Sequence, residues 1–278
     1  MVSQEKSDIA PMGSLNSLRL ALGQGPEARQ IAVEHRSGAA PGLFWLNGYR
    51  SVMTGAKAMA LDALGAQRGL AVTRFDYSGD GQSGGTFADG TISRWLEDAE
   101  AAFALGPGPQ IVCGSSMGGW IALLLARRQL QLGRPLKGLI LIAPAVDATS
   151  TLLPARMTEA QRQQLDRQGF FERDSRYGDG PYLYTRRFIE DGNRHSLFGQ
   201  VIETGCPVHI LQGGQDPDVP PAHAHKLMAH ILHDPVSLTL IPDGDHRLSR
   251  DQDLDLLQRI VLGMLPPDVT PVKAGISA

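Results

Sequence analysis

Residues 114–119 read Gly-Ser-Ser-Met-Gly-Gly, and this stretch decides how the rest of the chain is interpreted. It follows the short apolar run 110–113 and leads into the apolar run 120–126, an order typical of a strand, a sharp turn and a helix. A serine at the tip of such a turn is held clear of the backbone, near the positive end of the following helix. The glycines two positions either side of Ser116 avoid collisions as the turn closes. The stretch therefore predicts a nucleophile elbow rather than a plain glycine-rich connection.

A nucleophilic serine needs a general base, which follows it along the chain in proteins with this turn. The apolar run 236–241 ends in Pro-Asp-Gly-Asp-His, so His246 lies just after a predicted strand, at the edge where active-site loops of open α/β sheets gather. We expect His246 to be the base. No metal site is expected, because no carboxylate or cysteine completes a ligand set with the histidines at 223, 225, 230 and 233.

Three aspartates are candidates for the acid that orients the base. Asp216 follows the apolar run 207–211 and two glycines that allow a tight turn. Asp218 lies two residues further on, and Asp147 follows another predicted strand, 139–143. We expect Asp216 to be the acid, with Asp218 and Asp147 as the alternatives.

Acyl chemistry also needs two backbone N–H donors for the oxyanion. Met117, the residue after the nucleophile, supplies the first. The apolar run 43–46 is followed by Asn-Gly-Tyr-Arg, so the amide of Tyr49 is the expected second donor, with Gly48 letting the backbone come close. Many hydrolases carry histidine where Asn47 stands, a difference that leaves the backbone donor in place.

A competing motif lies at residues 79–84, where Gly-Asp-Gly-Gln-Ser-Gly matches Gly-x-Gly-x-x-Gly after the apolar run 70–75. A dinucleotide-binding turn opens a helix at its third glycine. Here residues 85–90 continue as a loop, so we interpret the motif as a turn and expect no cofactor.

Taken in order, these segments resemble the α/β-hydrolase superfamily from about residue 31 to 262. Within it, the chain is similar to the mitochondrial depalmitoylating hydrolases, also described as acyl-glucuronide esterases, and to their bacterial relatives. Residues 74–79, with Gly81 and Ser83, are similar to the turn that usually follows this strand in the superfamily. The closer resemblance rests on four stretches: Gly48-Tyr49 with 53–58; 74–79; 114–120 with Trp95; and Asp245-His246-Arg247 with the loop at Asp216. It implies Ser116 as nucleophile, Asp216 as acid and His246 as base. Asn47, Gly214 and Gln215 depart from the pattern, so acyl specificity does not transfer with the resemblance.

Apolar runs alternate with helical patterns, which predicts an α/β fold: a mostly parallel sheet with helices on both faces, the α/β-hydrolase fold. Strands are expected near 29–35, 43–46, 70–76, 109–113, 137–143, 207–212 and 236–241. Helices are expected near 54–68, 91–104, 117–131, 221–232 and 252–264.

One domain accounts for the chain, with a core formed by residues 28–147 and 205–264. Residues 148–204 break the alternation and are too long for a plain connection, so they predict a helical lid insert that selects the substrate. Residues 1–27 are polar and mixed and predict a flexible arm, and residues 265–278 predict a tail.

The composition, 42% hydrophobic and 20% charged over 278 residues, is typical of a single-domain enzyme. A net charge of −3 provides no basic field for nucleic acid or an anionic membrane. Stable membrane insertion is not expected, since no apolar stretch reaches about 18 residues. Cys113 lies inside a predicted strand and Cys206 at the start of a later one, which suits two buried thiols in a reducing compartment. No signal segment is apparent, so a cytoplasmic protein is expected.

Together these features predict a serine esterase or thioesterase that acts through an acyl-enzyme on a small-molecule ester or an acylated substrate. A peptidase or a cofactor-free perhydrolase is an alternative with the same triad. A non-catalytic ligand-binding relative is an alternative of a different class. The oligomeric state stays open.

Overall fold

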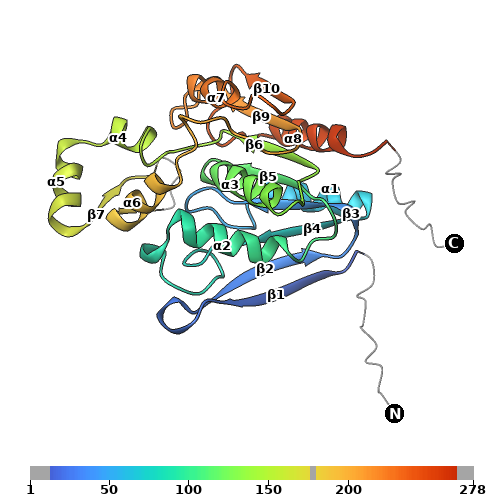
Figure 1. The fold of residues 1–278 in the computed structure, drawn as a ribbon, viewed down its shortest axis with the longest axis horizontal. Coiled ribbons are helices and arrows are strands. Elements are labelled where there is room, and N and C mark those ends of the chain that lie inside the picture. The colour runs from blue at the N-terminus through green and yellow to red at the C-terminus, as the bar shows by residue number, and fades with distance from the viewer. Residues whose placement is uncertain (1–12, 176–179, 268–278) are drawn as a thin grey trace, which may run out of the picture.

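A mostly parallel eight-stranded sheet forms the centre of the computed structural model, which describes residues 13–175 and 180–267 (Figure 1). The strands lie in the order β1 (Leu15–Leu22), β2 (Arg29–Arg36), β4 (Leu70–Phe75), β3 (Ala39–Leu46), β5 (Ile111–Ser115), β6 (Gly138–Ile142), β9 (Val208–Gly213) and β10 (Val236–Ile241). β2 is antiparallel to both of its neighbours, and all other pairs are parallel. The parallel strands bring the loops that follow them to one edge.

Helices cover both faces of this sheet, as predicted. On one face lie α1 (Ala56–Arg68) and α8 (Asp251–Met264), and on the other lie α2 (Ile92–Phe103), α3 (Met117–Gln131) and α7 (Pro221–Met228). Figure 1 shows α2 and α3 in front of the sheet. The side chains of β6 alternate between two apolar clusters, because Leu139 and Leu141 pack with α2 and α3 while Ile140 and Ile142 pack with α1 and α8. Burial on both faces explains why the central strands are continuous apolar runs.

The prediction of a flexible arm over residues 1–27 is wrong for the described part of that segment, residues 13–27. Residues 15–22 form β1, which pairs antiparallel with β2 along its whole length. Leu18, Leu20 and Leu22 are half-buried against the core, and the residues between them face solvent. This two-residue period is the signature of an edge strand with one covered face. Residues 1–12 of the predicted arm and 268–278 of the predicted tail lie outside the described residues.

The insert between β6 and β9 extends to the left of the sheet in Figure 1. It contains α4 (Leu152–Arg156), α5 (Glu159–Gln168), β7 (Phe170–Arg173), β8 (Tyr182–Thr185) and α6 (Arg186–Arg194). β7 and β8 pair as an antiparallel two-stranded sheet. The predicted helical insert therefore also contains a strand pair, which the sequence does not predict.

Two buried carboxylates anchor the insert to the core. Asp191, on α6, accepts hydrogen bonds from the N–H and the hydroxyl of Ser93, both at 2.8 Å. Asp147, just after β6, accepts from the Ser196 hydroxyl at 2.6 Å and from the Leu197 N–H at 2.8 Å. The end of the insert is thus tied to α2 and to the loop where the insert leaves the core.

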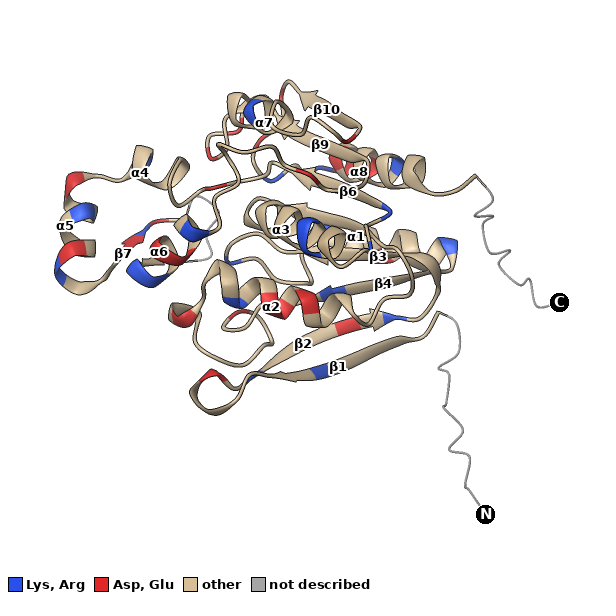
Figure 2. Cartoon of the chain, in the orientation of Figure 1, with Lys and Arg blue, Asp and Glu red and all other residues tan. Residues whose placement is uncertain are grey.

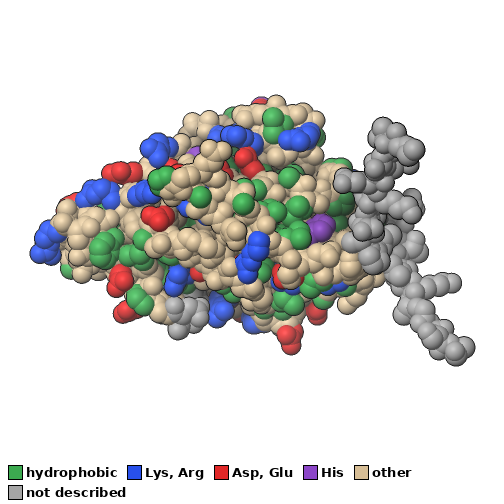
Figure 3. Space-filling model, turned by 90° about the horizontal axis from the view of Figure 1, so that it is seen from below, with side chains coloured by type: hydrophobic (Ala, Val, Ile, Leu, Met, Phe, Trp, Pro, Cys, Tyr) green, Lys and Arg blue, Asp and Glu red, His purple; other side chains and the backbone are tan. Residues whose placement is uncertain are grey.

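Charged side chains of both signs are mixed over the surface. Blue and red bands alternate along α5 in Figure 2, and both signs are interspersed on the face seen from below in Figure 3. On α5, Arg162 faces Glu159, and Asp166 faces Arg186 of α6. Within the described ranges, no helix combines the length and the apolar character needed to cross a membrane.

Candidate active site

Ser116 lies at the tip of a tight turn between β5 and α3. Its backbone has φ 54° and ψ −118°, a conformation that non-glycine residues rarely adopt. A Cβ atom built on Gly114 would lie 2.3 Å from the carbonyl oxygen of Gly118, and one built on Gly118 would lie 2.3 Å from that of Leu46. The turn closes only because both positions lack a side chain, which is the geometry that the sequence motif predicts.

We expect Gly114→Ala to lower the free energy of unfolding by about 3 kcal/mol, because its methyl group would overlap the backbone of α3. Urea denaturation monitored by circular dichroism measures this change. Gly263→Ala is the matched control, since a Cβ at that position in α8 meets nothing within 4 Å. The control variant should be as stable as the wild type or up to about 1 kcal/mol more stable. Equal stability of the two variants would contradict the steric argument.

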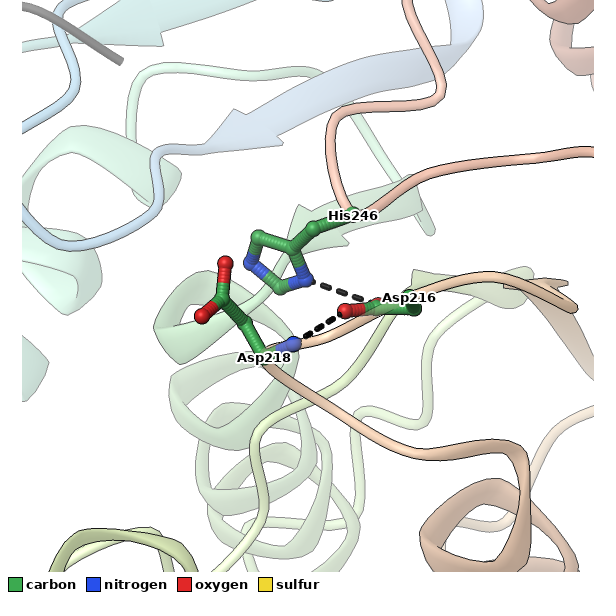
Figure 4. A group of neighbouring side chains, drawn as sticks. All are labelled: Asp216, Asp218 and His246. Carbon is green, nitrogen blue, oxygen red and sulfur yellow. Dashed lines mark hydrogen bonds and ion pairs between the residues drawn. The ribbon is translucent and has the colours of Figure 1, made fainter. Parts of the chain in front are cut away.

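The structure brings Ser116, His246 and Asp216 together from three separate loops. His246 Nε2 lies 3.1 Å from Ser116 Oγ, and His246 Nδ1 lies 2.8 Å from Asp216 Oδ2. A carboxylate only accepts, so Nδ1 carries the proton and Nε2 is free to accept the serine hydroxyl. The Asp216 side chain is fully buried, and its other oxygen accepts the N–H groups of Asp218 and Val219 at 2.7 and 2.8 Å (Figure 4). These bonds fix the carboxylate against the imidazole.

The two alternative acids have other partners. The Asp147 carboxylate is occupied by the end of the insert, where it accepts the N–H groups of Leu197 and Phe198. Asp218 Oδ1 lies 3.1 Å from Arg156 Nη1, so this carboxylate forms an ion pair with the insert. Of the three candidates, Asp216 is the one with a hydrogen bond to His246 Nδ1.

Asp216, Asp218 and His246 also place donor atoms within 4.8 Å of one another, a spacing compatible with a bound cation. The residues fit a metal ion poorly, however. His246 Nδ1 already donates to Asp216, and both Asp216 oxygens accept hydrogen bonds. An ion would also compete with the guanidinium of Arg156 for Asp218. The cluster is therefore explained as a hydrogen-bonded network.

The predicted oxyanion donors lie beside the serine. A Cβ built on Gly48 would lie 3.3 Å from the Ser115 carbonyl oxygen and 3.4 Å from Ser116 Cβ, so the loop after β3 passes directly against the turn. Tyr49 and Met117 line the same cavity as Ser116. Met117 is the first residue of α3, so its N–H has no acceptor within the helix. Both residues therefore lie near Ser116, and the role of their amides as oxyanion donors stays a prediction.

Asn47 shows how this loop is held without the histidine that many hydrolases carry. Its amide donates to the Phe75 carbonyl oxygen at 2.6 Å and accepts from Trp45 Nε1 at 2.7 Å. The buried side chain therefore ties the end of β3 to the end of β4.

The glycine-rich turn at 79–84 wraps around a buried carboxylate. Asp76 accepts the N–H groups of Gln82 at 2.8 Å and Met53 at 2.7 Å, and a Cβ on Gly81 would lie 2.2 Å from Asp76 Oδ2. The next α-helix, α2, begins only at Ile92. The glycines serve a compact turn, which agrees with its interpretation from the sequence.

A cavity of about 290 Å³ opens at Ser116 between the core and the insert. Its apolar lining includes Val52, Trp120, Leu152, Leu153, Tyr184 and Phe188. Its charged lining, as far as the described residues form it, comprises Lys57, Arg156, Arg173, Asp174, Asp218 and Arg247. The insert supplies side chains of both kinds, whereas two of its aromatics, Phe171 and Phe198, pack away from the cavity.

The ring of Tyr49 joins the oxyanion loop to the insert. It stacks on Tyr184 of β8 with ring centroids 5.2 Å apart and planes 5° from parallel, and it meets Phe188 of α6 at 5.2 Å. Its hydroxyl donates to the carbonyl oxygen of Leu183. Burial raises the pKa of this phenol well above its usual range, so it remains a donor at neutral pH. The sequence predicts a role for the amide of Tyr49 but does not predict this contact of its side chain.

Comparison with known proteins now relates this site to a family. A sequence profile described as serine aminopeptidase S33, of the α/β-hydrolases, matches residues 47–168. The mitochondrial palmitoyl-protein thioesterase ABHD10 of Mus musculus is 34% identical over 235 residues, which cover 83% of this chain and 77% of the mouse protein. The chain belongs to the ABHD10 family of α/β-hydrolases.

Further members and neighbours of the ABHD10 family agree. The Homo sapiens protein of the same name is 32% identical over 236 residues, covering 84% of this chain and 75% of that protein. The solved structure of mouse ABHD10 superposes with a TM-score of 0.79 at 31% identity, over 90% of this chain and 98% of the other. A crystal structure from Agrobacterium vitis S4 gives a TM-score of 0.88 at 46% identity, over 91% and 100% of the two chains. The predicted α/β-hydrolase fold and the family resemblance are confirmed.

Proposed function

We propose that this chain is a serine hydrolase that cleaves carboxylic esters or thioesters through an acyl-enzyme. The observation that carries the proposal is the continuous hydrogen-bonded series from Ser116 Oγ through the imidazole of His246 to the buried Asp216. It opens into a cavity with room for an acyl group. Proteins with such a series use the serine as nucleophile.

In the proposed reaction, His246 Nε2 accepts the proton of Ser116 as Oγ attacks the acyl carbonyl carbon. The negative charge that develops on the carbonyl oxygen is stabilised by the N–H groups of Tyr49 and Met117. The imidazolium, held by Asp216, then gives its proton to the departing alcohol or thiol as the bond to the acyl carbon breaks. A water molecule, activated by the same histidine, cleaves the ester bond to Ser116 and releases the acid.

The lining of the cavity supports an acyl substrate. The apolar side chains listed above bury an acyl chain favourably, and the name of the mammalian relatives, palmitoyl-protein thioesterase, indicates an acyl thioester as the substrate class. The three arginines at 156, 173 and 247 favour an acyl-glucuronide type of substrate as the second candidate, because its carboxylate would be attracted to them.

The cavity is less suited to the peptidase alternative. An aminopeptidase has to bind a cationic amine, yet among the described residues the lining holds Lys57 and the same three arginines, compared with two acids, Asp174 and Asp218. This excess of positive charge opposes a positively charged substrate.

Turnover of matched oxygen esters and thioesters, with acyl chains from two to sixteen carbons, tests the proposal. We expect hydrolysis that depends on Ser116, with a preference for longer thioesters. Activity confined to short esters would keep the mechanism and reject the thioesterase assignment. If a fluorophosphonate probe does not label Ser116 and no ester is cleaved, the chain is instead the non-catalytic ligand-binding relative.

The cellular location is a separate proposal. The sequence predicts a cytoplasmic location, whereas the names of the mammalian relatives give a mitochondrial location for those proteins. Fractionation of cells that express the tagged full chain distinguishes the two.

A further inference from the structure

Lys57, the second residue of α1, reaches across to the loop that carries His246. Its ammonium donates to the carbonyl oxygen of Arg247 and, at 3.0 Å, to the hydroxyl of Ser249. These acceptors follow the histidine by one and three residues. Lys57 also lines the cavity with Ser116 and His246, although it is about 60 positions from the first and 190 from the second along the chain.

The loop needs such a tie because its backbone is strained. Leu248 has a φ of 43°, which is unfavourable for a residue with a large side chain and persists only where the surroundings hold it. From within the loop, Asp245 accepts the N–H groups of Arg247 and Leu248, both at 3.0 Å. Lys57 adds a contact from a different element, packed on the sheet.

We propose that Lys57 is a positioning residue for His246. By holding the backbone after the histidine, it keeps Nε2 within reach of Ser116 Oγ. The inference rests on the proposed function, in which His246 is the base. It assigns Lys57 no contact with the reacting atoms, so its loss should slow the chemical step and leave substrate binding nearly intact.

The charge on Lys57 gives the inference a signature in pH. Burial lowers the pKa of this amine to about 8, and the nearby Arg247 acts in the same direction. Asp245, in the loop, and Asp253, on α8, oppose that change. The ammonium form is therefore complete well below pH 8 and is lost as the pH rises through about 8. A neutral amine makes weaker hydrogen bonds than an ammonium, so kcat should decline over that range.

The test compares Lys57→Met, which keeps the length of the side chain and removes its donors, with Lys226→Met. Lys226 lies on α7 outside the cavity, 4.2 Å from the centre of the Phe198 ring. For a Ser116-dependent acyl ester, we expect Lys57→Met to lower kcat about 100-fold and change KM less than about threefold. Lys226→Met should leave both constants unchanged. The decline of kcat above pH 8 should appear in the wild type and in Lys226→Met and be absent in Lys57→Met.

A folded Lys57→Met protein with kcat within about twofold of the wild type would overturn the inference. So would a rise in KM at constant kcat, which would assign Lys57 to substrate binding. If Lys57→Met does not fold, Ser249→Ala decides, since it removes one acceptor and keeps the lysine. We then expect a decrease in kcat of about fivefold, and an unchanged kcat would reject the inference. Hydrolysis that survives Ser116→Ala would instead reject the proposed function itself.

Discussion

Replacement of Ser116 by alanine is expected to lower kcat/KM for an acyl ester by about 10⁵-fold, down to the residual rate supplied by the oxyanion donors and binding. The reason is geometric: Oγ is the atom 3.1 Å from His246 Nε2, and alanine leaves the base with no hydroxyl to deprotonate. Steady-state hydrolysis of a chromogenic ester at equal protein concentrations measures the change, and fluorophosphonate labelling should be lost in the variant.

Ser115→Ala is the matched control for this variant. Ser115 is the last residue of β5 and also lines the cavity, but the hydrogen bonds of the site involve Ser116. The control should keep kcat/KM within about fivefold of the wild type. Equal losses in the two variants would mean that the turn, rather than the hydroxyl of Ser116, was damaged.

The second large effect is expected for Asp216→Asn, which should lower kcat by about 10⁴-fold. The asparagine amide would face His246 Nδ1 with a donor where the carboxylate accepts, which favours the tautomer with its proton on Nε2. That tautomer cannot accept the proton of Ser116. Circular dichroism and thermal unfolding should show a folded protein, while kcat reports the loss.

Asp147→Asn is expected to have the opposite effects, a loss of stability with little change in kcat. Its carboxylate holds the end of the insert through Ser196, Leu197 and Phe198, so we expect a loss of about 2–3 kcal/mol in the free energy of unfolding. The kcat of the folded fraction should stay close to that of the wild type. If Asp147→Asn, rather than Asp216→Asn, abolishes turnover in a folded protein, the acid has been assigned to the wrong residue.

The features that the sequence predicted well are those encoded by neighbouring residues. The turn at Ser116 is decided by the two glycines beside it, and α3 begins and ends where the pattern predicts. The central strands were recognisable because burial on both faces makes them continuous apolar runs. Their order places Asp216 and His246 at one edge, which the chain order of the loops already indicated.

Other features depend on partners far along the chain. The sequence analysis missed β1 because its alternating leucines lie within a segment that is polar and mixed as a whole. The strand is stabilised by its pairing with β2. The choice among three aspartates depends on the hydrogen bond of Asp216 to His246, which lies 30 residues further along the chain. The predicted helix 221–232 ends at Met228, beyond which the His230 carbonyl oxygen accepts the N–H of Ile202, near the end of the insert.

The contacts of Tyr49 have a consequence for how members of the family can diverge. Its backbone supplies a donor to the proposed oxyanion site. Its hydroxyl and its ring bind β8, through the carbonyl oxygen of Leu183 and the ring of Tyr184. A chimaera that carries a foreign insert would have to present a carbonyl acceptor and an aromatic face at the same place. Without them, a graft intended to change acyl preference would also disturb the loop that holds the reacting carbonyl. Substrate range and catalytic rate are therefore inherited together in this architecture, and exchange of the insert alone does not separate them.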